Sequence, residues 1–161
     1  MKNMVLATGV LATTLLAAGA ALAQGPGNSY GAVYLGGNTA GSSSTLSFGG
    51  LMGYNFSSRP GAVTGIEEEV GIDTKSNWGS AGAVSGTVSG RAGYSLGQAL
   101  VFGKLGLGYS SANTGYWVIG AGVDYDLSGG AFVRGEVDRA DPYKAGLNSE
   151  NQVKLGIGWN F

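Results

Sequence analysis

Three consecutive glutamates, Glu67-Glu68-Glu69, are the side chains in this sequence that could most directly do chemistry. Paired carboxylates can act as a general acid and base, and they can also hold a calcium ion. Successive side chains of an extended strand point to opposite sides, so only Glu67 and Glu69 would share a face. Their role therefore depends on whether basic side chains face the same way, because bases would favour structural ion pairs over catalysis.

The composition removes most of the partners that such chemistry needs. The 161-residue chain contains no histidine and no cysteine. Imidazole bases, thiolate metal sites and histidine-assisted serine nucleophiles are therefore excluded. The formal net charge is −1 and no basic run is present, which gives no reason to expect nucleic-acid binding. We expect no enzymatic activity, no metal and no cofactor.

The elements that must position these residues follow a period of two, which is typical of strands. The last segment shows it most clearly. One parity carries Val153, Leu155, Ile157, Trp159 and Phe161, and the other carries Lys154, Gly156, Gly158 and Asn160. Such a strand has one oily face and one small, polar face.

The same alternation predicts eight strands, at 30–37, 46–56, 62–72, 84–96, 101–109, 117–127, 131–139 and 153–161. Short turns are expected at 57–61, 96–98 and 128–130, and connections that are mostly longer at 37–45, 73–80, 110–115 and 140–151. Alternating short and long connections are typical of an up-and-down barrel with two different rims. The expected fold is all-β, an eight-stranded antiparallel transmembrane β-barrel.

The charges decide which face meets lipid. A soluble barrel would turn its apolar parity inward and its charges outward. Here most charged residues of the strands share the parity of glycine and serine, which predicts an ion-paired lumen inside an apolar wall. The ten lumen residues are Glu67, Glu69, Arg91, Lys104, Asp124, Asp126, Arg134, Glu136, Asp138 and Lys154, with the acids paired mainly to the four bases.

Glu68 departs from this rule, because it falls on the apolar parity between Ile66 and Val70. It could be protonated, lie near a rim, contact another molecule, or follow an unseen bulge. An aromatic girdle is expected at the short-turn end, formed by Tyr54, Phe56, Tyr94, Tyr125, Trp159 and Phe161.

Residues 1–23 have the features of a cleaved signal peptide. A basic start at Lys2 precedes an almost uncharged run, and Ala21 and Ala23 form a small-x-small motif before Gln24. The mature barrel domain is then 24–161.

Several stretches together resemble the small outer-membrane β-barrel proteins of Gram-negative bacteria, the porin-like or opacity-type surface proteins. They are the segments 32–37, 52–56, 65–71, 90–94, 120–125 and 153–161. The resemblance implies an outer-membrane location after export through the periplasm, and contact with membrane lipid and lipopolysaccharide. It also implies that Trp159 and Phe161 form the signal read by the barrel-assembly machinery. We expect a monomer.

Three functions are compatible with these features. The first is a structural and surface role in the cell envelope. The second is a narrow porin-like channel for ions or very small solutes. The third is binding through the outer loops, with Asn77, Trp78, Tyr143 and Asn148 as candidates.

Overall fold

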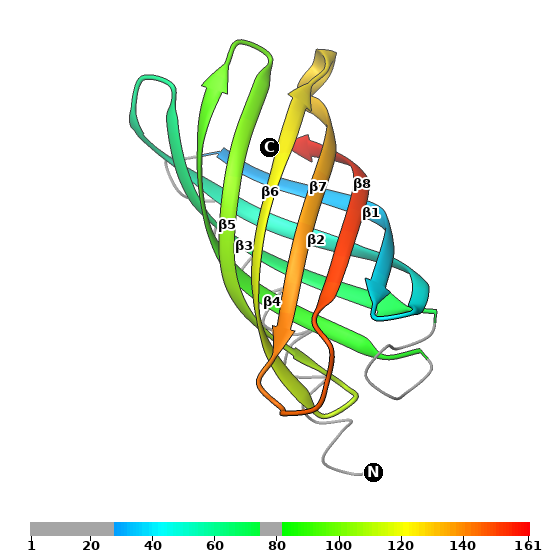
Figure 1. Ribbon diagram of the computed structural model, residues 1–161. Helices are drawn as coiled ribbons and strands as arrows, with labels where there is room; N and C mark the ends of the chain where they lie inside the picture. Colours follow the sequence, from blue (N-terminus) through cyan, green and yellow to red (C-terminus); the bar gives the residue numbers. More distant parts are fainter. Residues whose placement is uncertain (1–27, 75–81) are drawn as a thin grey trace.

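The computed structural model describes residues 28–74 and 82–161, which form one closed antiparallel barrel of eight strands (Figure 1). Each strand pairs with the next, and β1 closes the barrel against β8. The predicted fold class is therefore confirmed. The strands are β1 (Asn28–Ala40), β2 (Ser43–Arg59), β3 (Ala62–Asp73), β4 (Val84–Leu96), β5 (Ala99–Ser110), β6 (Thr114–Asp126), β7 (Ala131–Pro142) and β8 (Glu150–Asn160).

The stagger of the strands sets their tilt. Tyr30 of β1 pairs directly with Asn160 of β8. When the paired residues are followed from Tyr30 through β2 to β7 in turn, the residue reached on β8 is Glu150 instead. The offset from 150 to 160 is a shear of ten residues. For eight strands this shear gives a tilt of about 40° and an axial rise of about 2.5 Å per residue. A strand of twelve residues then spans roughly 30 Å, enough to cross the apolar band of an outer membrane.

The two rims carry different parts of the chain. The terminal rim holds both ends of the barrel, Asn28 and Phe161, and the short connections 60–61, 97–98 and 127–130. The last of these includes a short 3-10 turn, Ser128–Gly130. The distal rim holds the other four connections, and those after β3 and β7 are the longer ones. Within residues 28–74 and 82–161, no helix has the length and apolar character needed to cross a bilayer.

The expected connection 37–45 is wrong, and 110–115 is longer than the connection observed there. β1 and β2 are joined by Gly41 and Ser42 alone, with a positive φ of 58° at Gly41 that glycine adopts without strain. β5 and β6 are joined by residues 111–113. The polar residues Thr45 and Ser47 belong to β2 and are buried in the barrel interior. In a barrel with a polar lumen, a serine-rich stretch is as compatible with a strand as with a loop.

The polarity of the barrel is inverted relative to a soluble protein. Large apolar side chains cover the outer wall, with Leu35 71% and Leu155 70% exposed. Charged side chains fill the interior, where Glu67 is 2%, Arg134 3% and Lys154 4% exposed. Because exposed leucine is favourable only in an apolar solvent, the wall is built to face lipid.

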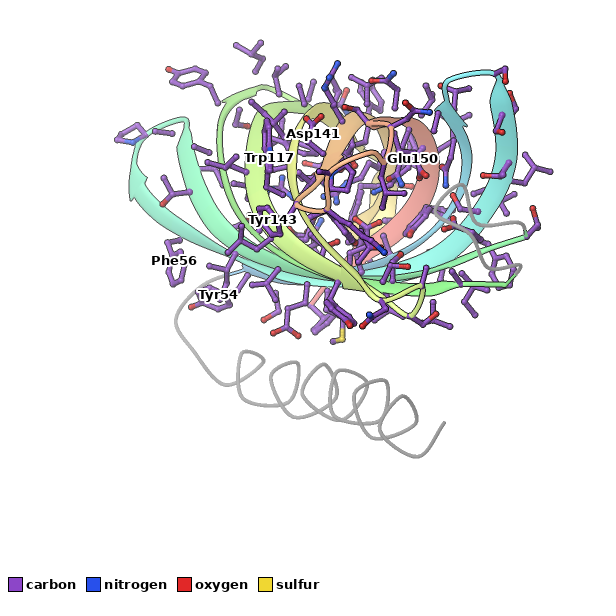
Figure 2. The ribbon with its side chains drawn as sticks, turned by 60° about the horizontal axis from the view of Figure 1, so that its bottom comes forward. Tyr54, Phe56, Trp117, Asp141, Tyr143 and Glu150 are labelled. Carbon is purple, nitrogen blue, oxygen red and sulfur yellow. The ribbon has the colours of Figure 1, made fainter. Side chains whose placement is uncertain are left out.

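Aromatic side chains border this wall at both rims. At the terminal rim Phe56, Tyr94, Tyr125, Trp159 and Phe161 are exposed, as the girdle prediction requires. Tyr54 belongs to the same outer face and packs its ring 4.9 Å from that of Phe56, although little of it is exposed (Figure 2). A second set, not predicted, lies toward the distal rim and consists of Tyr109, Trp117 and Tyr143. Two aromatic belts are typical of the two interfaces of a membrane.

Candidate functional site

Nine of the ten charged residues expected in the lumen are buried there. Their parity places them inside because they alternate with the apolar residues of the wall. They are the acids Glu67, Glu69, Asp124, Glu136 and Asp138 and the bases Arg91, Lys104, Arg134 and Lys154. Asp126 is the exception: as the last residue of β6 it is exposed at the terminal rim, where the strand has passed the end of the lumen.

The arginine layer is the half of this cluster nearer the terminal rim. Arg134 makes a two-pronged contact with Asp124, from Nε at 2.6 Å and from Nη2 at 2.8 Å. Its Nη1 donates to Glu67 at 2.5 Å. Arg91 donates to Asp124 at 2.9 Å and to the Tyr30 hydroxyl at 2.7 Å, and Tyr30 donates to Glu67 at 2.8 Å. These charge-assisted bonds connect β1, β3, β4, β6 and β7 across the barrel.

Aromatic rings enclose the two guanidinium groups. The Arg91 guanidinium carbon lies 4.1 Å from the Phe102 ring centre and 5.0 Å from that of Tyr30. Arg134 lies 4.9 Å from Phe102 and 5.7 Å from Phe132. Contacts of this length over ring faces stabilise a cation that has lost its water.

The lysine layer lies next to the arginine layer on its distal side. The Lys104 ammonium lies 2.6 Å from Glu136, 3.2 Å from Asp138, 3.3 Å from Glu69 and 3.6 Å from Glu67. Lys154 lies 2.5 Å from Glu69, 2.7 Å from Asp138 and 3.4 Å from Glu136. Glu67 therefore contacts both layers, so the arginine and lysine layers form one continuous cluster.

The metal and acid–base roles considered for the glutamates are not supported by this geometry. Carboxylate oxygens of Glu67, Glu69 and Glu136 do come within 4.8 Å of one another, as cation ligands would. However, the Lys104 ammonium contacts all three groups, so a side-chain cation already stands among them. These carboxylates are engaged as ion-pair partners, which favours the structural role.

Inward-facing aromatic rings are the feature that the sequence did not predict. Tyr30, Tyr34, Phe102, Tyr116 and Phe132 are buried in the lumen. The glycines on facing strands could have indicated these rings, because each ring occupies the space that a Cβ at the facing glycine would fill. The pairs are Tyr30 with Gly53, Tyr34 with Gly49 and Gly71, Phe102 with Gly122, Tyr116 with Gly108, and Phe132 with Gly158. These six inward glycines thus face rings, whereas Gly36 and Gly106 face the side chains of Ser47 and Ser89, and Gly120 faces Asp138.

The distal end of the lumen is polar and contains a small cavity. Asn38 donates to Asp73 at 2.8 Å and accepts from Ser47 at 3.1 Å. A cavity of about 20 Å³ lies beside the lysine layer, with Thr87 and Gln152 among its lining residues. This volume is enough for about one or two water molecules.

Glu68 lies on the outer wall, half-buried, with Met52 and Val88 as its paired neighbours. It is the seventh of the twelve residues of β3, so it does not lie near a rim. The register shift between β2 and β3 is confined to Ser57 and Arg59, so a bulge does not explain its orientation either. Protonation and contact with another molecule are the explanations that remain.

The expected assembly signal lies on the seam that closes the barrel. Trp159 and Phe161 are exposed, and the Phe161 amide donates to the Ser29 carbonyl at 2.9 Å. Their role in assembly stays a prediction. The cleavage residues Ala21, Ala23 and Gln24 lie outside the described residues, as do Asn77 and Trp78 of the candidate loop.

A closed eight-stranded barrel with an apolar wall, two aromatic belts and an ion-paired lumen defines the class of outer-membrane β-barrel proteins. Sequence comparison agrees: a 22 kDa outer membrane protein of Rhizobium leguminosarum bv. viciae is 29% identical in an alignment that covers 73% of this chain and 68% of the relative. No family model matches the sequence. The resemblance, the class and the outer-membrane location are thereby confirmed.

Solved structures share the fold at low sequence identity. A de novo designed transmembrane β-barrel has a TM-score of 0.61 and 19% identity, with 86% of this chain and 98% of that chain covered. Neisserial surface protein A (NspA) has a TM-score of 0.58 and 8% sequence identity, with 84% of this chain and 97% of that chain covered. The attachment invasion locus protein Ail of Yersinia pestis was solved with the heparin analogue sucrose octasulfate. It has a TM-score of 0.54 and 13% sequence identity, with 84% of this chain and 99% of that chain covered. Because one of these barrels was designed de novo, sharing the fold implies no particular activity.

Proposed function

We propose that the protein has a structural role in the outer membrane, as a closed, non-conducting and non-enzymatic barrel. The observation that carries this proposal is the filling of the lumen. Two layers of ion pairs and five aromatic rings occupy it, and the cavity beside the lysine layer measures about 20 Å³. Interiors of eight-stranded barrels are generally filled by side chains, whereas aqueous channels need more strands.

The alternative is a narrow channel for ions or very small solutes. Conductance across a planar bilayer separates the two functions. The refolded wild-type protein should give no discrete openings, and openings would contradict the structural proposal. An Arg134→Ser variant is the matched comparison, because it removes the guanidinium that contacts both Asp124 and Glu67. A current in this variant alone would support the view that the arginine layer closes the lumen.

Binding of a polyanion through the distal rim has less support. Ail was solved with a heparin analogue, but the described distal rim here carries Arg139 and Lys144 beside Asp73, Asp141 and Glu150. Arg139 is already paired with Asp141 at 3.0 Å. Figure 2 shows Asp141 and Glu150 on this rim together with Trp117 and Tyr143. A rim with acids and bases intermixed is a poor surface for a polyanion.

The partners we propose are the membrane and its assembly pathway. The apolar wall suits outer-membrane lipid, including lipopolysaccharide, and the exposed Trp159 and Phe161 suit recognition by the barrel-assembly machinery. Copurifying lipid can be measured by mass spectrometry after extraction in mild detergent. Absence of lipopolysaccharide from repeated preparations would contradict that partner.

A further inference from the structure

Glu68 is an acid at the middle of a lipid-facing wall. Its neighbours on the same face are Ile66 and Val70 along β3, and Met52 and Val88 on the adjoining strands. Ile66 and Val88 are 42% and 53% exposed, so this part of the wall faces outward. At about 2.5 Å of rise per residue, Glu68 lies roughly 12–15 Å from either end of β3. This position is close to the centre of the hydrocarbon layer.

A carboxyl group at this depth needs a hydrogen-bonding partner. Water is absent from the hydrocarbon, and an isolated charge there is far more costly than a neutral carboxyl. Among the described residues, the structure shows no hydrogen bond or ion pair for Glu68. The described barrel therefore offers this carboxyl no partner, which favours another molecule within the membrane as its source.

The depth of Glu68 limits what that partner can be. Two copies of one membrane protein insert with the same orientation, so a two-fold axis between them is normal to the membrane. Residues that meet across such an axis lie at the same depth. The exposed wall residues near the depth of Glu68 on the other strands are apolar, such as Leu105, Val137 and Leu155. Among the described residues, the polar group that a second copy offers at this level is its own Glu68.

We propose that Glu68 marks a dimer interface, in which the neutral carboxyls of two copies hydrogen-bond to each other across a two-fold axis. A neutral carboxyl both donates and accepts, so the pair is self-complementary. The interface is isologous, which is the commonest arrangement in homodimers. It goes beyond the structural role proposed above and replaces the expectation of a monomer.

The wall beside Glu68 permits close approach of a second copy. Gly50 and Gly90 lie diagonally next to it, two residues from its partners Met52 and Val88. A Cβ at Gly90 would meet nothing within 4 Å, and one at Gly50 would meet only the Ala32 carbonyl at 3.6 Å. Small residues let membrane segments approach closely enough for polar groups to pair. Two convex barrels touch over a limited area, so the predicted dimer is weak and depends on this pair.

Crosslinking of single-cysteine variants tests the proposal, since the natural chain contains no cysteine. A Val88→Cys variant places a thiol beside Glu68 without removing the carboxyl. The control is Val137→Cys, which is 55% exposed and is the seventh of twelve residues on β7, as Glu68 is on β3. Both purified proteins are reconstituted in phospholipid vesicles at several dilutions and treated with a short bifunctional maleimide. Folding is verified by the mobility of unboiled samples.

The expected result is several-fold more crosslinked dimer for Val88→Cys than for Val137→Cys at every dilution. Adding Glu68→Leu should reduce the yield to the control level, while Glu68→Gln, which still donates and accepts, should retain most of it. Equal yields for the two cysteine positions would overturn the proposal, as would a yield unaffected by Glu68→Leu. Crosslinking in cells only to a protein of different mass would also overturn it, in favour of a different partner.

Discussion

Lys104 is the side chain whose removal tests the lumen most sharply. Its ammonium lies within 3.6 Å of four carboxylates, and its side chain is 1% exposed. Lys104→Met keeps an unbranched chain of similar length, so the variant removes the charge with little loss of packing. The lumen then holds five carboxylates and three bases in place of four.

The loss of unfolding free energy in Lys104→Met depends on the ion pairs that remain in the lumen. Removing one partner of a buried ion pair costs about 3–5 kcal/mol, because the other charge stays desolvated. Lys154 still contacts Glu69, Glu136 and Asp138, which reduces the loss. We therefore expect the lower value, about 3 kcal/mol, which is roughly a 150-fold change in the unfolding equilibrium constant.

The assay is urea unfolding in phospholipid vesicles, followed by tryptophan fluorescence. Trp117 and Trp159 lie on the outer wall and report departure from lipid. Lys144→Met, at an exposed loop position, is the control and should change stability by less than about 0.5 kcal/mol. The double variant Lys104→Met with Glu136→Gln restores the charge balance and should recover about 1–2 kcal/mol. A loss below about 1 kcal/mol for Lys104→Met, or no recovery in the double variant, would contradict the ion-pair role assigned to Lys104.

Three further outcomes are expected. Arg91→Ala should lower the thermal midpoint of the barrel, measured by mobility of unboiled samples across a temperature series, whereas the exposed Arg139→Ala should not; equal midpoints for wild type and Arg91→Ala would exclude the assigned pairing. Gly53→Ala should destabilise by about 1–3 kcal/mol in the urea assay because its methyl group meets an inward ring, while Gly90→Ala, which meets nothing within 4 Å, should be nearly neutral. Deleting Phe161 should leave export to the periplasm intact but reduce the folded outer-membrane fraction, and normal membrane levels would contradict its role in assembly.

The strands and the two faces could be predicted from the sequence, because a period of two needs no knowledge of neighbouring strands. Segment 153–161 alternates without exception, and its parity assigns the inside of the other strands. The connections 37–45 and 110–115 could not be bounded in this way. Serine, threonine and glycine are normal both in loops and on a polar lumen face, so composition does not mark where β2 begins.

The partners within the lumen could not be predicted, because they depend on register. Glu69 pairs with Lys154 across 85 residues of sequence, and only the closure of β1 on β8 brings them together. The inward rings were missed for the same reason. Tyr30 and Tyr34 lie in a segment with large residues on both parities, and the glycines that accommodate them are on other strands.

The ion layers explain how one register is selected over others. Lipid is as apolar as the wall, so the outer face alone gives little preference for one strand alignment over another. The interior does discriminate, because a slip of β3 by one residue would reverse the orientation of all its side chains. Glu67 and Glu69 would then face lipid in place of Glu68, and the contacts of Glu67 with Arg134 and of Glu69 with Lys154 would be lost. A single acid on the wall is thus compatible with the fold, whereas the alternative register would place two there and leave buried bases without partners.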